Sequence, residues 1–128
     1  VAATTAGYDA ALRMLRPGVT EAQVQDAMED AYRAAGAREV AYNSIVGAGL
    51  NGTVLHYMAN RATVQEGDLL VIDSGAAFAG YASDVTRTFP ASGRFTPKQR
   101  RVYEIVLESL DAGIAAARAG VTNGEVDR

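Results

Sequence analysis

Asp73-Ser74-Gly75-Ala76-Ala77-Phe78-Ala79-Gly80-Tyr81-Ala82-Ser83-Asp84 is the stretch that decides the fold of this chain. The apolar residues 69–72 precede its first aspartate, and the β-branched run at residues 85–89 follows its second. Such runs are typical of paired strands, and Gly80 marks a turn between them. The sequence therefore predicts a β-hairpin that carries one acidic side chain on each strand.

The register of this hairpin brings the two aspartates together. A turn over residues 77–80 would pair Ala76 with Tyr81, and counting back pairs Asp73 with Asp84. Directly opposed residues share one face of the sheet, with Cβ atoms about 4.5–5.5 Å apart. Two carboxylates at that separation repel each other, and on a half-buried face they are costly. A divalent cation between them would make the arrangement favourable, so the pattern predicts a metal site.

Composition limits the remaining possibilities. The 128 residues suffice for one domain with a core, and 48% of them are hydrophobic. A net charge of −3 argues against a nucleic-acid surface. Because the chain has no cysteine, any metal must be held by oxygen or imidazole. No apolar stretch approaches the roughly 20 residues that span a membrane, and no secretory signal is visible, so we expect a cytoplasmic protein.

The periodicity of apolar residues changes twice along the chain. Helical spacing predicts helices over residues 4–15, 21–35 and 97–119, and strands are expected at 43–47, 53–57, 69–72 and 85–89. Thr20, Thr96 and Thr122 each begin a capping box, in which Gln or Glu follows three residues later. Helices before and after a group of antiparallel strands indicate an α+β fold. The third helix places these apolar residues on one face: Val102, Ile105, Val106, Leu110 and Ile114.

Residues 16–24 resemble residues 118–126, which suggests an internal repeat. Both copies have Arg, Gly, Val and Thr in the same places, where one helix ends and another begins. Any helix–turn–helix joint can converge on such residues. The alternative is a duplicated fold, in which the chain stops soon after its second unit begins at about residues 110–128. We then expect residues 1–128 to form a single partial domain, because a helix starting at Thr122 has under two turns and is marginal alone.

Several segments resemble the pita-bread metallopeptidases, in particular their proline-specific branch of Xaa-Pro aminopeptidase and Xaa-Pro dipeptidase. The matching segments are residues 42–47, 51–52, 55–57, 67–75 and 81–90. With residues 93–103 added, the resemblance covers nearly the whole chain. It implies the first half of a pita-bread fold, an antiparallel β-sheet covered by helices. Two similar halves build that fold, which agrees with the internal repeat.

The resemblance also implies a set of site residues. In the family, two aspartates, one histidine and two glutamates hold two divalent metal ions, commonly Mn²⁺, with Co²⁺ or Zn²⁺ as alternatives. The aspartates correspond to Asp73 and Asp84, whereas the other three ligands belong to a C-terminal half that is absent here. His56, the only histidine, matches a catalytic, substrate-binding residue rather than a ligand. Tyr42 is expected either to reach the substrate site with its hydroxyl or to lie in the core.

The implied function is a metal-dependent exopeptidase that cleaves peptides with proline after the first residue. The chain alone should be inactive, with its C-terminal half supplied as a missing segment or a second chain. A homo-oligomer is possible, and neither nucleic acid nor membrane is an expected partner. Arg87 alternates away from Asp84 along its strand, which favours a structural salt bridge over a role at the site.

Two other functions remain open at this stage. Methionine aminopeptidases share the two-aspartate hairpin, although residues 55–57 and 86–90 look more like the proline branch. A pita-bread interaction module without catalysis is the second alternative, but such relatives usually lose metal ligands. The choice between aminopeptidase and dipeptidase depends on what caps the substrate pocket. The glycine-rich residues 47–52 lack the Gly-Lys-Ser/Thr ending of a phosphate-binding loop, which argues against nucleotide binding.

Overall fold

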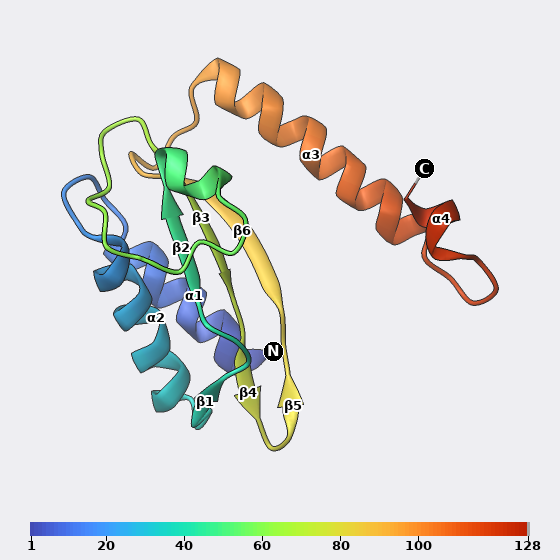
Figure 1. Cartoon of the computed structure of the whole chain (residues 1–128), viewed down its shortest axis with the longest axis horizontal. Helices are drawn as coiled ribbons and strands as arrows, with labels where there is room; N and C mark the ends of the chain where they lie inside the picture. The colour runs from blue at the N-terminus through green and yellow to red at the C-terminus, as the bar shows by residue number, and fades with distance from the viewer. Residues whose placement is uncertain (128) are drawn as a thin grey trace. The chain divides into compact units, whose positions relative to one another are not determined.

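The computed structural model describes residues 1–127. They form two compact units, one covering Val1–Arg94 and the other beginning at Phe95. Figure 1 shows the elements in chain order, with helices before and after a group of strands. They are α1 (Ala2–Met14), α2 (Glu21–Ala34), β1 (Glu39–Val40), β2 (Ile45–Ala48), the 3₁₀ helix η1 (Gly49–Thr53), β3 (Leu69–Ser74), β4 (Ala76–Phe78), β5 (Tyr81–Ala82), β6 (Val85–Pro90), α3 (Pro97–Ala116) and α4 (Asn123–Val126). The predicted α+β class is confirmed.

The helices start where the capping boxes predict. In α2 the Thr20 hydroxyl accepts from the Gln23 amide at 3.2 Å, and the Thr20 amide donates back to the Gln23 side chain at 2.9 Å. The same exchange at Thr96 begins α3. These bonds satisfy amide groups that the first turn of a helix would otherwise leave without partners. No helix within residues 1–127 combines the length and the apolar character needed to cross a bilayer.

The strands form two antiparallel three-stranded sheets, ordered β2-β3-β6 and β1-β4-β5. The predicted hairpin exists, but its predicted register is wrong by two residues. Asp73 pairs with Thr86 rather than with Asp84. The turn consists of only Ala79 and Gly80, both with positive φ (51° and 83°), instead of four residues. A two-residue turn of this kind matches the twist of the strands, and this advantage outweighs the reluctance of alanine to adopt positive φ.

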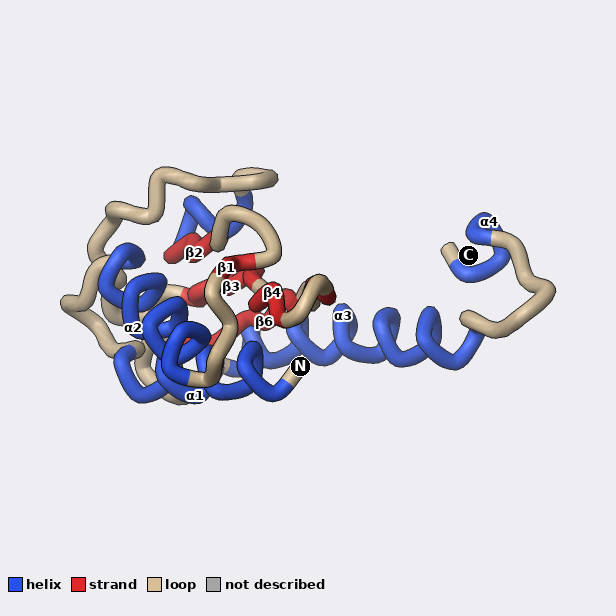
Figure 2. The backbone as a smooth tube through the Cα atoms, turned by 90° about the horizontal axis from the view of Figure 1, so that it is seen from below, coloured by secondary structure: helices blue, strands red, loops and turns tan. Residues whose placement is uncertain are grey.

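Residues 53–57 do not form the predicted strand. The chain continues from β2 into η1 and then into an irregular loop. Figure 2 shows this loop on the opposite side of the strands from α1. The apolar side chains of Val54 and Leu55 suggested a strand, but they are exposed and lie in a turn closed by a bond from the Tyr57 amide to the Val54 carbonyl.

The core of the first unit lies between the helices and one face of the main sheet. Leu70, Ile72 and Ser74 alternate toward this core along β3 and are fully buried. The Tyr8 hydroxyl of α1 donates to the backbone carbonyls of Ile72 and Val85, which ties the helix across β3 and β6. Asp73 and Val71 lie on the opposite face of β3, where Gly52 of η1 packs against Val71.

Gly7 allows α1 and α2 to pack closely. A Cβ atom at this position would lie 2.0 Å from the Tyr32 ring and 2.9 Å from Met28. We expect Gly7→Ala to lower the free energy of unfolding by about 1–2 kcal/mol, because overpacking outweighs the gain in helix propensity. Chemical denaturation measures this change. Gly113→Ala in α3 is the matched control, since nothing lies within 4 Å of its Cβ position; an equal loss in both variants would contradict the packing argument.

The second unit contains α3 and α4. The predicted helix is present, and its apolar residues are largely exposed, Ile114 at 64% and Val106 at 62%. The joint between α3 and α4 has the same local backbone as the joint between α1 and α2. Gly18 and Gly120 both have φ of 93°, and Thr122 donates its amide to Glu125 at 2.7 Å as Thr20 does to Gln23. The sequence repeat is therefore also a repeat of local structure.

Candidate metal and substrate site

The two aspartates lie on the same face despite the corrected register. Asp73 is opposite Thr86, and Asp84 lies two residues before Thr86, so strand alternation turns both carboxylates to one side. The Tyr42 hydroxyl lies within 2.5 Å of Asp73 Oδ1 and 2.9 Å of Asp84 Oδ1. Because this hydroxyl has one proton, the two carboxylates must share it. A single oxygen thus marks the point at which both acidic side chains converge.

The Tyr42 side chain is half-buried, and its hydroxyl points toward the two aspartates. Burial raises the pKa of the Tyr42 hydroxyl, and its hydrogen bonds to the two aspartates raise the pKa further. The phenol therefore keeps its proton and acts as a donor. The Ala41 amide next to it donates to the Gly75 carbonyl at 2.7 Å, which fixes this segment against the hairpin.

Gly75 explains how Asp84 comes so close. A Cβ atom on Gly75 would lie 1.7 Å from the Ser83 carbonyl oxygen and 3.2 Å from the Asp84 nitrogen. Only glycine permits this approach of one strand to the other. The Ser83 amide and hydroxyl then donate to the Ala76 carbonyl at 3.2 Å and 3.1 Å. The glycine between the two acidic positions is thus part of the geometry of the site.

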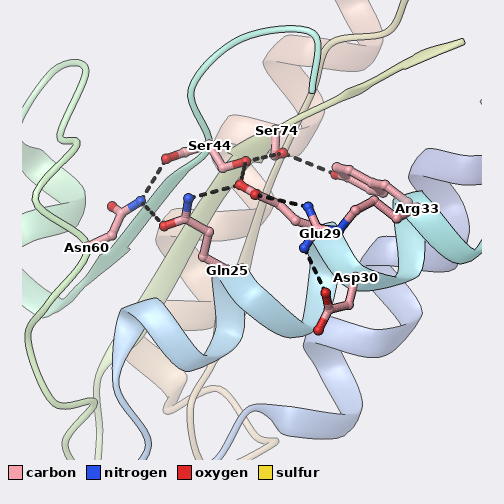
Figure 3. Close-up of polar contacts among 8 residues, drawn as sticks. Gln25, Glu29, Asp30, Arg33, Ser44, Asn60 and Ser74 are labelled. Carbon is pink, nitrogen blue, oxygen red and sulfur yellow. Dashed lines mark hydrogen bonds and ion pairs between the residues drawn. The ribbon is translucent and has the colours of Figure 1, made fainter. Parts of the chain in front are cut away.

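A buried polar network joins α2 to the end of β3 and to the segment before β2 (Figure 3). The Ser44 and Ser74 hydroxyls lie 2.9 Å apart, and Tyr32 donates to Ser74 at 3.1 Å. Ser44 also donates to Glu29 on α2 at 2.8 Å. Within residues 1–127, every buried side-chain nitrogen and oxygen has a hydrogen-bond partner. A fully satisfied network of this kind rigidifies the strands that carry the site.

His56 lies above the same face of the sheet. It lines two neighbouring pockets that Asp73 also lines; Val71 and Thr86 contribute to one of them, and Tyr42 and Asp84 to the other. His56 is exposed and has φ of 53°, a conformation that is uncommon for a residue other than glycine. Strained backbone of this kind clusters at functional sites. The structure therefore brings together all four residues that the sequence singled out.

Arg87 takes no part in this constellation. Its guanidinium donates to the Thr86 carbonyl at 2.7 Å, and the ion pairs found within residues 1–127 do not include it. The predicted salt bridge was wrong, because the exposed face of β6 offers Arg87 no carboxylate within reach. Sequence reasoning also missed the role of Gly75, whose neighbour Ser83 lies on the other strand of the hairpin.

The donors present suit part of a metal site. Two convergent carboxylates offer the hard oxygen ligands that divalent ions prefer. Among residues 1–127, however, no group of three or more histidine, aspartate or glutamate side chains could hold a metal ion. The chain thus fits a metal with two ligands and leaves further ligands to be supplied from elsewhere.

Comparison with known proteins identifies the family to which this chain is similar. The model of metallopeptidase family M24 matches residues 1–128. The chain is 42% identical over 123 residues to Xaa-Pro aminopeptidase of Escherichia coli, and 41% identical over 111 residues to that of Haemophilus influenzae. These alignments cover 96% and 87% of the chain but only 28% and 26% of the two relatives.

Solved structures agree with these alignments. Escherichia coli aminopeptidase P in a glutamate-to-alanine variant with bound substrate, and in a zinc-substituted form with product, both superpose with a TM-score of 0.95 at 41% identity. Each match covers 98% of this chain and 29% of the solved chain. The fold and the acidic hairpin are therefore those of a metallopeptidase. The chain belongs to metallopeptidase family M24, and it spans less than a third of the length of these relatives.

Proposed function

We propose that the protein containing this chain is a metal-dependent exopeptidase that removes the residue before proline at the N-terminus of peptides. The observation that carries the proposal is the convergence of Asp73 and Asp84 on the Tyr42 hydroxyl. The names of the relatives favour an aminopeptidase over a dipeptidase. The rest of the protein, in the same chain or as a separate one, would supply the remaining ligands.

The numbering of the Escherichia coli variants supports these assignments. The solved structures include alanine variants of one histidine and two aspartates that are 17 and 11 residues apart in that protein. His56, Asp73 and Asp84 have the same two separations. This agreement is expected if the three positions correspond without insertions, and it supports the roles proposed for His56, Asp73 and Asp84.

The residues of the site have distinct roles in the proposal. Asp73 and Asp84 would supply carboxylate ligands to divalent metal ions, and Mn²⁺ is the proposed metal. When bound, such ions polarise the scissile carbonyl and make a water molecule acidic enough to ionise near neutral pH. Tyr42 holds the two carboxylates in place. His56 donates a hydrogen bond to the substrate or to the oxyanion that develops during attack.

A panel of peptides tests the specificity. The complete protein, loaded with Mn²⁺, is incubated with Xaa-Pro-Xaa tripeptides, Xaa-Pro dipeptides and Met-Ala-Xaa tripeptides, and released amino acids are quantified. We expect release of the first residue from Xaa-Pro-Xaa, little from Xaa-Pro dipeptides, and none from Met-Ala-Xaa. Preferential release of methionine would instead indicate a methionine aminopeptidase. A protein that takes up no metal and cleaves nothing would be an interaction module.

A further inference from the structure

Glu21 is a completely buried carboxylate with no role in the site described above. It begins α2, and its side chain points into the first unit with 0% exposure. Its partners are four hydrogen-bond donors, none of them a cation. Burial by itself would raise the pKa of Glu21, but these four hydrogen bonds together outweigh burial and lower the pKa. The group is therefore held as a buried anion, which is an expensive arrangement unless every oxygen is satisfied.

The four donors all belong to one segment of the chain, residues 48–62. Glu21 Oε1 accepts from the Ala48 amide at 2.8 Å and from Asn51 at 2.9 Å. Glu21 Oε2 accepts from the Tyr57 hydroxyl and from the Ala62 amide, both at 2.9 Å. Ala48 ends β2, and Ala62 lies where the chain returns to the core. One carboxylate thus joins the two ends of the loop and two side chains within it.

This loop carries His56. The hydroxyl of Tyr57, the next residue, donates to Glu21 and accepts a hydrogen bond from the Asn51 side-chain amide at 3.0 Å. These bonds fix the loop directly beside His56. A further bond joins the Glu21 amide to the Ala62 carbonyl at 2.9 Å. By contrast, the His56 side chain is exposed, and its positive φ must be maintained by its neighbours. The hydrogen bonds that Glu21 accepts at the base of the loop and from Tyr57 support the backbone on either side of His56.

We propose that Glu21 is a positioning residue for the peptidase reaction: its carboxylate clamps the loop of residues 48–62 and thereby holds His56 over the face of the sheet that carries Asp73. The inference rests on the proposed function for its effect on turnover, whereas the clamp itself is a property of the fold. Glu21→Gln should break the clamp, because the amide nitrogen that replaces one oxygen cannot accept the hydrogen bond that the Ala48 or Ala62 amide donates to that oxygen.

The test is a double-mutant cycle in the complete protein, using Glu21→Gln, His56→Ala and the pair. We expect Glu21→Gln to lower kcat for an Xaa-Pro-Xaa peptide by about tenfold or more, and to have little further effect once His56 is absent. Asp30→Asn is the matched control, since it removes one carboxylate from the exposed face of the same helix, where it pairs with Arg33. Equal losses with and without His56 would overturn the proposal.

Hydrogen exchange measured by mass spectrometry separates the clamp from the reaction. Amides of residues 48–62 should exchange at least about tenfold faster in Glu21→Gln, with α1 unchanged. Unchanged exchange in the loop would also overturn the proposal. If Glu21→Gln fails to fold, Tyr57→Phe keeps the carboxylate and both backbone bonds, and it should raise exchange near His56 alone; no change there would count against the clamp. If the wild-type protein cleaves no Xaa-Pro peptide while the variants still show these exchange differences, the proposed function is refuted and the clamp is retained.

Discussion

Asp84→Ala should lower Xaa-Pro hydrolysis by the complete protein by about 10³-fold or more, because several kcal/mol of metal-dependent transition-state stabilisation would be lost. Asp84 directly precedes β6 and is exposed, and within residues 1–127 its carboxylate bonds to the Tyr42 side chain rather than to backbone, so its removal should leave the hairpin folded. Steady-state kinetics measures the activity. Circular dichroism and metal analysis of the same sample show whether the fold is kept and the metal lost.

A matched control removes a carboxylate without touching the site. Asp68→Asn lies at the turn before β3, where its side chain accepts from the Gln65 amide at 2.8 Å. We expect this variant to keep its metal and most of its activity. If Asp84→Ala retained normal metal content and normal turnover, the assignment of Asp84 as a ligand would be wrong.

Gly75→Ala should damage both the fold and the site. The added methyl group would lie 1.7 Å from the Ser83 carbonyl oxygen, which is backbone and cannot rotate away. The strand must therefore move, and we expect a loss of about 3 kcal/mol in the free energy of unfolding. Because Asp84 follows Ser83 directly, the same movement separates it from Asp73, and metal affinity should fall as well.

Denaturant titration and metal titration check the two parts of this prediction. Gly113→Ala again serves as the control, because its Cβ would meet nothing within 4 Å. A Gly75→Ala protein with unaltered stability and unaltered metal affinity would show that the close approach of the strands is not required.

The sequence predicted features that depend on neighbouring residues. The three capping boxes lie where expected, because each requires only a threonine and a glutamine or glutamate three residues later. The helix α2 ends within a residue of the expected position. Such patterns are local, so a single sequence contains them.

The features that the sequence did not predict depend on distant contacts. The hairpin register was wrong because it depends on Ala79 adopting positive φ, which its side chain disfavours. Glu21 looked like an ordinary acidic residue in the first turn of a helix, and its backbone partners Ala48 and Ala62 lie 27 and 41 residues away. Nothing near Glu21 in the sequence shows that it is buried. His56 was found through its family resemblance, whereas its loop was mistaken for a strand.

Anomalous diffraction from crystals of the complete protein grown with Mn²⁺ tests the central claim most directly. We predict two manganese peaks bound by the carboxylates of Asp73 and Asp84, within about 2.3 Å of their oxygens. The remaining ligands should come from the part of the protein outside this chain. Manganese bound elsewhere, with the two aspartates still joined through Tyr42, would contradict the account.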